Sequence, residues 1–282
     1  MSTLAGSLFR EVKLLLLSFL LVIGMPPARS GGLWMPAGAR QAGLDHCSVA
    51  LTGFWGVENN LAGMAVVKNF SAGLGYENRF LLPHMGTASL GVVSPVKYGN
   101  LGLSLRYYGF SLFHQMKLGL TFARAFGRKL RMGVQLDYLQ TGFGDIYGSR
   151  NNFSFAIGIQ TDIFKKLTLG IYVFNPVPVK LAGYAKEKIP SVYRLGLAYH
   201  FSENLLATAE VEKNTENRPF VVRGGVEYLF RKQFVFRTGF GSTGDVFSFG
   251  LGWRTKNLHF DIAATMHQSL GFSPEASFVF SF

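Results

Sequence analysis

From about Phe70 to the last residue, Phe282, the sequence repeats one short pattern. Segments of roughly nine to twelve residues alternate large apolar side chains with small or polar ones, and turn-forming residues separate the segments. Successive side chains of a β-strand point to opposite faces, so each segment has one apolar and one polar face. The spacings of three and four that indicate helices are missing from these segments. The chain is therefore predicted to be all-β.

The alternation is clearest in the segments 153–160 and 247–254. In the first, one face carries Phe, Phe, Ile and Ile, and the other carries Ser, Ala, Gly and Gln. In the second, one face carries Phe, Phe, Leu and Trp, and the other carries Ser, Gly, Gly and Arg. The whole pattern predicts about fourteen strands. They are expected near 70–78, 87–94, 99–109, 114–125, 130–141, 151–162, 166–175, 191–201, 204–213, 219–230, 233–241, 245–254, 257–266 and 274–282.

A soluble β-sandwich or lipocalin-like barrel would alternate in the same way, with its apolar face turned inward. Three features favour a barrel that spans a membrane. The small-or-polar face carries many glycines and single charges, as a lumen does, whereas the apolar face is almost free of charge. The chain ends on Phe282 in an alternating strand, which resembles the signal read by outer-membrane insertion machinery. Aromatic residues also lie near strand ends, where membrane girdles form, at Tyr107, Tyr108, Tyr138, Tyr199, Tyr228 and Trp253.

These features predict a transmembrane antiparallel β-barrel of about fourteen strands. Aromatic residues make up 15% of the chain, which excludes a disordered protein. The formal net charge is +12, but the basic residues are spread singly and form no nucleic-acid-binding module. Nucleic acid is therefore not an expected partner. The positive charge is expected to lie near outer-membrane lipid and lipopolysaccharide phosphates, or to line the lumen.

The N-terminus reads as an export signal. Arg10 and Lys13 precede the apolar run 14–24, and small residues follow at Ala28 and Ser30. The run is too short to be a membrane-spanning helix. We expect a signal peptide at 1–30 that is cleaved near Ser30, a hatch or plug at 31–68 and the barrel at 69–282. This organisation predicts the outer membrane of a Gram-negative bacterium.

The segment before the first strand reads as coil and short helix. Its expected hatch residues are Phe54, Trp55, Asn59 and Asn60. The single cysteine, Cys47, permits no internal disulfide and is expected to be a free, buried thiol. The loop 175–190 is the longest gap between strands and is expected to be extracellular.

Two interpretations remain open for the charges of the polar face. They can form a network that braces the barrel and pairs with the hatch. They can also form a basic lumen that attracts anions such as a fatty-acid carboxylate, because the arginine fork binds a carboxylate with two hydrogen bonds. The candidate ligand residues are Arg106, Arg194 and Arg223 first, followed by Arg237, Glu227 and Asp261. The expected inward face also carries Glu77, Lys117, Arg131, Asp137, Glu210 and Arg254.

Nothing in the sequence marks an enzyme. The six histidines show no metal-ligand spacing, so no metal and no cofactor are expected. A barrel phospholipase would need a serine with a histidine, and His200 with Ser202 or His259 with Ser248 offer that pairing. No local feature marks either serine as a nucleophile, and a catalytic triad is recognised by geometry. No catalytic residue is predicted.

Several short motifs together resemble a known family. Residues 38–43 read Gly-Ala-Arg-Gln-Ala-Gly, 49–51 read Val-Ala-Leu, and 59–63 read Asn-Asn-Leu-Ala-Gly. These stretches resemble the N-terminal signature of PorV/PorQ-type outer-membrane proteins, which are relatives of the FadL barrel. The usual Asn-Pro-Ala of that signature is Asn-Asn-Leu here. The stretches 223–228 and 237–240 also resemble the family.

The resemblance implies a fourteen-stranded barrel with an N-terminal plug. PorV/PorQ-like function as a structural or accessory protein of type IX-like protein secretion is the first functional prediction, with secretion-system proteins as partners. The alternative is a FadL-like passive channel for small hydrophobic molecules. The accessory role predicts a plugged lumen and an outer loop surface around 175–190. The channel predicts an apolar track that passes a hatch at 54–63 and leaves through a gap in the wall.

Overall fold

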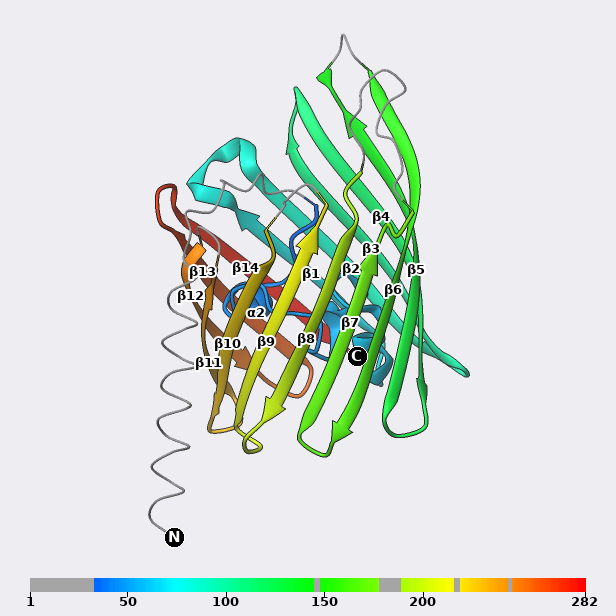
Figure 1. The fold of residues 1–282 in the computed structure, drawn as a ribbon, viewed down its shortest axis with the longest axis vertical. Coiled ribbons are helices and arrows are strands. Elements are labelled where there is room, and N and C mark those ends of the chain that lie inside the picture. Colours follow the sequence, from blue (N-terminus) through cyan, green and yellow to red (C-terminus); the bar gives the residue numbers. More distant parts are fainter. Residues whose placement is uncertain (1–32, 145–147, 178–188, 216–218, 243–244) are drawn as a thin grey trace.

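The structure is a computed structural model that describes residues 33–144, 148–177, 189–215, 219–242 and 245–282. The predicted signal peptide therefore lies outside the described residues. Strands β1 to β14 form one closed antiparallel barrel in which each strand pairs with its neighbours in the chain, and β14 closes on β1 (Figure 1). Closure satisfies the backbone hydrogen bonds of the wall, as a hydrocarbon environment requires. The prediction of a fourteen-stranded all-β barrel is confirmed.

The strand bounds agree closely with the repeated sequence pattern. The largest differences are longer strands at β2 and β6 and two short 3₁₀ helices between β1 and β2, η3 Arg79–Leu81 and η4 Pro83–Met85. The strands are β1 Ser71–Asn78, β2 Gly86–Val96, β3 Gly99–Phe110, β4 Phe113–Phe126, β5 Leu130–Gly142, β6 Ser149–Phe164, β7 Leu167–Phe174, β8 Val192–His200, β9 Leu205–Asn214, β10 Val221–Phe230, β11 Phe234–Gly241, β12 Asp245–Arg254, β13 Leu258–His267 and β14 Gly271–Ser281.

The apolar face of the strands points outward. Phe155, Leu195 and Phe249 keep 41%, 51% and 51% of their surface exposed, whereas their chain neighbours Ser154 and Arg194 are buried in the lumen. A soluble β-barrel would show the opposite arrangement, so the exterior has the character of a lipid-facing surface. One prediction was wrong. Tyr108 does not join an outer aromatic girdle but is buried in the lumen, because Tyr107 beside it takes the outward position.

The two ends of the barrel differ in their connections. The end where β1 begins and β14 ends carries the short turns 97–98, 127–129, 165–166, 201–204, 231–233 and 255–257. The longest connections, 79–85 and 175–191, join strands at the other end, where β4, β5 and β6 rise above the rest of the wall (Figure 1). In outer-membrane barrels the short turns face the periplasm and the long loops face outward.

The lumen is filled by the segment that precedes β1. It contains the short helix α2 Ala39–Ala42 and two 3₁₀ helices, η1 Phe54–Val57 and η2 Leu61–Val66. We call residues 33–67 the plug. Its apolar side chains, such as Val57 and Met64, pack with wall residues such as Val93 and form the protein's main core. None of the described helices is both long and apolar enough to span a membrane.

Candidate binding site above the plug

The plug packs against wall glycines, and we call Gly158 and Gly170 the glycine seat. A Cβ atom added to Gly170 of β7 would lie 2.1 Å from the Val49 carbonyl oxygen, and one added to Gly158 of β6 would lie 2.1 Å from Asn60 Oδ1. The Asn60 side chain donates to the Val49 carbonyl at 2.6 Å and reaches the Ile171 carbonyl of the wall at 3.2 Å. Plug and wall therefore approach at a distance that only glycine permits.

A buried ion-pair network fastens one side of the plug. Glu227 of β10 accepts two hydrogen bonds from the plug guanidinium of Arg40, at 2.9 and 3.0 Å. It also pairs with Arg237 at 2.7 Å and with Arg254 at 3.3 Å. Arg237 in turn pairs with Asp261 at 2.8 Å. The Glu227 carboxylate thus pairs with three guanidinium groups, one of which, that of Arg40, belongs to the plug.

A second network fastens the other side. Glu210 of β9 accepts hydrogen bonds from the backbone N–H groups of Ser48 and Val49, at 2.7 and 2.8 Å. Its neighbour Glu212 pairs with Arg194 at 2.9 Å and with Arg223 at 3.0 Å. These inward charges therefore form a network of the kind expected from the first of the two interpretations. They link neighbouring strands of the wall, and they hold the plug.

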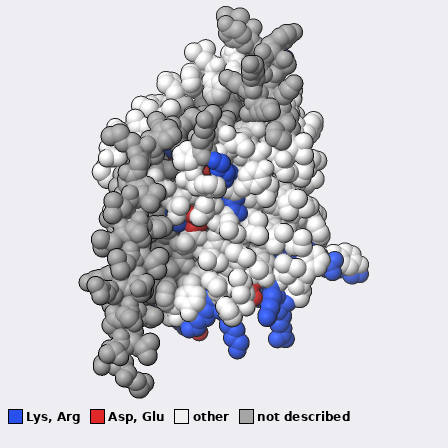
Figure 2. Space-filling view, in the orientation of Figure 1, with Lys and Arg blue, Asp and Glu red and all other residues white. Residues whose placement is uncertain are grey.

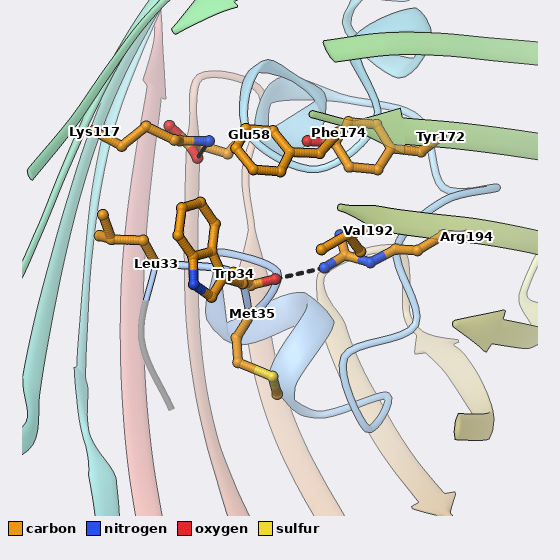
Figure 3. A pocket seen from close by; sticks show the side chains of 9 residues that line it. All are labelled: Leu33, Trp34, Met35, Glu58, Lys117, Tyr172, Phe174, Val192 and Arg194. Carbon is orange, nitrogen blue, oxygen red and sulfur yellow. Dashed lines mark hydrogen bonds and ion pairs between the residues drawn. The ribbon is translucent and has the colours of Figure 1, made fainter. Parts of the chain in front are cut away.

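A pocket lies between the plug and the wall, in the half of the barrel nearer the long loops (Figure 3). Its cavity volume is about 10 Å³, which is room for about one water molecule. Leu33, Trp34 and Met35 cover one side, and the plug residue Glu58 lies on another. The wall contributes Lys117 from β4, Tyr172 and Phe174 from β7, and Val192 and Arg194 from β8.

Aromatic rings give this pocket its character. The ring centroids of Trp34 and Phe174 lie 5.1 Å apart, and the guanidinium carbon of Arg194 lies 5.4 Å from the centre of the Tyr172 ring. The cations around the rings already have partners. Lys117 pairs with Glu58 at 2.7 Å, and Arg194 also donates to the Trp34 carbonyl at 2.6 Å. Aromatic rings therefore line the pocket beside charged groups that are already paired, which favours an uncharged ligand over an anion.

The structure separates the predicted ligand residues. Arg194 lines the pocket, and Arg106 lies beside it, donating to the carbonyl oxygens of Leu33 and Met35. Arg223, Arg237, Glu227 and Asp261 do not line the pocket and belong to the networks that hold the plug. A ligand-binding role for these six residues stays a prediction.

The other predicted site residues lie in two places. The expected hatch residues Phe54, Trp55, Asn59 and Asn60 are all buried in the plug. Phe282 lies at the short-turn end, where its N–H donates to the Phe70 carbonyl at 2.9 Å and its side chain is exposed. Its role as an insertion signal stays a prediction.

The sequence reasoning missed the aromatic residues of the pocket. Tyr172 and Phe174 occupy the inward positions of a strand whose other inward residues are small or polar. The sequence feature that could have identified them is the presence of large aromatic side chains on the otherwise polar face of this strand. Trp34 gave no signal of its own, because only the folded plug brings it to β7. Among the described residues no group of three or more histidine, cysteine or acidic side chains forms a metal site.

Cys47 provides a reporter for the position of the plug. It is buried, as expected for a free thiol. Burial raises the pKa of the Cys47 thiol well above its usual range, and the carboxylates of Glu210 and Asp45 raise it further. The thiolate is the reactive form, so we expect alkylation by iodoacetamide to be at least roughly tenfold slower in the folded barrel than after heat unfolding. Equal labelling rates would show that the plug does not shield this position.

Solved structures similar to this one are outer-membrane barrels of the FadL type. The Ralstonia pickettii toluene transporter TbuX matches with a TM-score of 0.68 at 12% identity, covering 88% of this chain and 99% of that one. The Pseudomonas putida toluene transporter TodX matches with a TM-score of 0.66 at 11% identity over 88% and 99% of the two chains. A Pseudomonas aeruginosa FadL homologue matches with a TM-score of 0.65 at 13% identity over 92% and 100%.

At these identities the likeness defines the fold, which is that of FadL-type outer-membrane barrels. No protein-family model matches the sequence. The search of curated proteins likewise found no match.

Proposed function

We propose that this protein is an outer-membrane barrel through which small hydrophobic molecules pass, and that the pocket formed by Trp34, Tyr172 and Phe174 is where they first bind. The pocket is the observation that carries the proposal. It lies in the half of the lumen nearer the long loops, between plug residues and the wall, and three aromatic rings are among its lining side chains. Rings combined with a few placed polar groups are typical of binding sites for small molecules.

Two further observations support the proposal. The exterior of the wall presents apolar side chains along its strands, as a membrane location requires. Two of the similar structures are toluene transporters, and a third is a FadL homologue. A monoaromatic hydrocarbon is therefore a suitable first probe. Its entry requires Trp34 or the plug to move, because the rings of Trp34 and Phe174 are already in contact, with centroids 5.1 Å apart.

The accessory role in type IX-like secretion is the second candidate, and one observation favours it. The plug fills the lumen and is fastened on one side by the Arg40–Glu227 ion pair and on the other by hydrogen bonds from Ser48 and Val49 to Glu210. A plugged lumen is what that role predicts, whereas a channel needs the plug to move. The outer loop expected to contact secretion partners, 175–190, lies mostly outside the described residues.

The channel proposal is tested by blocking the pocket. Val192 is buried at the pocket wall, and a tryptophan in its place would occupy the space beside Phe174. We expect Val192→Trp to lower the initial rate of radiolabelled toluene uptake by about tenfold or more in cells with an intact lipopolysaccharide layer, since a misfit in an apolar pocket has effects of this size. The variant's amount and folding are checked by heat-modifiable gel migration.

The matched control is Val173→Trp, which adds the same side chain on the outward face of the neighbouring strand β7. It is expected to leave uptake unchanged. Normal uptake by a correctly folded Val192→Trp variant would contradict the channel proposal. If uptake does not depend on the protein at all, and secretion components co-purify with it from membranes, the accessory role is the correct one.

A further inference from the structure

Basic side chains gather at one end of the barrel. Lys and Arg line the lower rim in Figure 2, while the wall above them is mostly uncharged. The exposed basic residues at this end, which we call the basic rim, are Lys68, Lys97, Arg124, Arg128, Lys129, Lys165, Lys166, Arg231, Lys232 and Lys256. Within the described turns of this end, Glu203 is the single exposed acidic side chain.

The basic rim lies at the short-turn end, not at the long-loop end where lipopolysaccharide phosphates would be. Five of the six short turns, 97–98, 127–129, 165–166, 231–233 and 255–257, contribute to it. In outer-membrane barrels this end faces the periplasm, so the nearest membrane anions are the headgroups of inner-leaflet phospholipids. Lipopolysaccharide as an anionic partner at the other end of the barrel stays a prediction.

Several of these cations lie against the lipid-facing wall. Arg124 is on the outward face of β4, and its guanidinium carbon lies 5.4 Å from the centre of the exposed Phe126 ring. At the β10–β11 turn the guanidinium carbon of Arg231 lies 5.2 Å from the Phe230 ring. At the β2–β3 turn the Lys97 ammonium lies 5.4 Å from the Tyr98 ring. Rings at this position hold the charges at headgroup depth along the wall.

The β10–β11 turn carries two charged residues at positions where the backbone favours asparagine and glycine. Arg231 and Lys232 both have positive φ, 48° and 60°, and the Gln233 N–H donates to the Phe230 carbonyl at 3.1 Å. This geometry is that of a type I′ turn, in which Asn-Gly is strongly preferred. Two long basic side chains are strained there, and strain that persists is a reason to look for a role.

We infer that the basic rim binds the anionic headgroups of inner-leaflet phospholipids such as phosphatidylglycerol. The inference depends on insertion in the membrane but not on transport. A soluble acidic partner would approach the turns from below and would have no use for an arginine on the lipid-facing side of β4. Each basic residue near an anionic surface strengthens binding by roughly fivefold, and salt weakens the effect.

Trp253 is placed to report on this lipid. It lies exposed on the outer face near the end of β12, cross-strand from Phe234, the residue that follows the charged turn. Trp55 is buried in the plug, and Trp34 lies in the lumen. The full chain is reconstituted in mixtures of phosphatidylethanolamine and phosphatidylglycerol, with one lipid or the other brominated on its acyl chains. Bromine quenches tryptophan fluorescence on contact, so the quenching of Trp253 gives the local lipid composition.

We expect brominated phosphatidylglycerol to quench Trp253 more strongly than brominated phosphatidylethanolamine at equal fraction, and added salt to remove the difference. The double variant R231N/K232G is expected to lower this preference by up to roughly 25-fold, which is about fivefold for each of the two charges lost. The variant introduces Asn-Gly, the sequence that a type I′ turn prefers, so reduced folding cannot explain a weaker preference for phosphatidylglycerol. The control Lys213→Gln removes a cation at the long-loop end and is expected to keep the preference.

Four results would overturn the inference. Equal quenching by the two lipids in the wild-type protein would overturn it while leaving membrane insertion intact. An unchanged preference in R231N/K232G would show that the turn charges do not recognise the lipid. Sedimentation with purified peptidoglycan that depends on Arg231 and Lys232, without any lipid preference, would identify the wall polymer as the partner instead. Quenching by neither lipid would overturn the membrane location as well.

Discussion

Replacing Glu227 by glutamine is expected to lower the free energy of unfolding by about 3–5 kcal/mol, the cost of removing one partner from a buried ion pair. The carboxylate is 8% exposed and lies between the guanidinium groups of Arg40, Arg237 and Arg254. Glutamine keeps the shape but leaves three neighbouring cations with less negative charge. Thermal unfolding followed by heat-modifiable gel migration in detergent measures the change.

Two comparisons make this test specific. Asp162→Asn removes the partner of Arg131 at a pair that is 29% exposed on the acidic side, and we expect a cost of only about 0–1 kcal/mol. The double variant Arg40→Gln with Glu227→Gln should recover part of the stability, because one of the uncompensated cations is gone. A Glu227→Gln protein as stable as the wild type would contradict the assignment of Glu227 as the centre of the network.

Replacing Gly170 by alanine is expected to loosen the plug. The added methyl group would lie 2.1 Å from the Val49 carbonyl oxygen, far inside contact distance. The plug cannot shift freely at this point, since the Val49 N–H is held by Glu210 at 2.8 Å. Overpacking of this kind costs about 1–3 kcal/mol. The open form should therefore become roughly five- to 150-fold more populated, and iodoacetamide should label Cys47 correspondingly faster.

The matched control is Ala209→Val, which adds bulk to the lipid-facing side of β9. It should leave the labelling of Cys47 as slow as in the wild type, because its side chain points away from the plug. If Gly170→Ala also leaves labelling unchanged while the barrel stays folded, the glycine seat does not control the plug. Faster labelling together with faster toluene uptake would connect plug movement to the proposed channel.

The strands and their faces could be predicted from the sequence because they depend on a local rule. Alternation with a period of two fixes which residues share a face, and an apolar exterior with glycine and single charges inside indicates lipid outside the wall. That rule placed Phe155 and Phe249 outward and Arg194 and Glu227 inward, as the structure has them. The same rule places Tyr108 inward, opposite Tyr107, so it was the assignment of both tyrosines to an outer girdle that was wrong.

The pocket could not be predicted in this way, because its residues come from the plug and from three separate strands. Trp34 meets Phe174 only after the plug has entered the lumen. The basic rim is another example, since its residues are spread through the sequence singly or in pairs and gather only when the turns come to one end.

The sequence by itself therefore determined the barrel, the orientation of its faces and the identity of the plug segment, since each depends on neighbours in the chain. Only the tertiary structure decided which inward charges hold the plug, which rings form a pocket and which end carries the basic rim. The physical reason is that barrel closure and plug insertion create these contacts, and no local pattern records which distant strands they bring together.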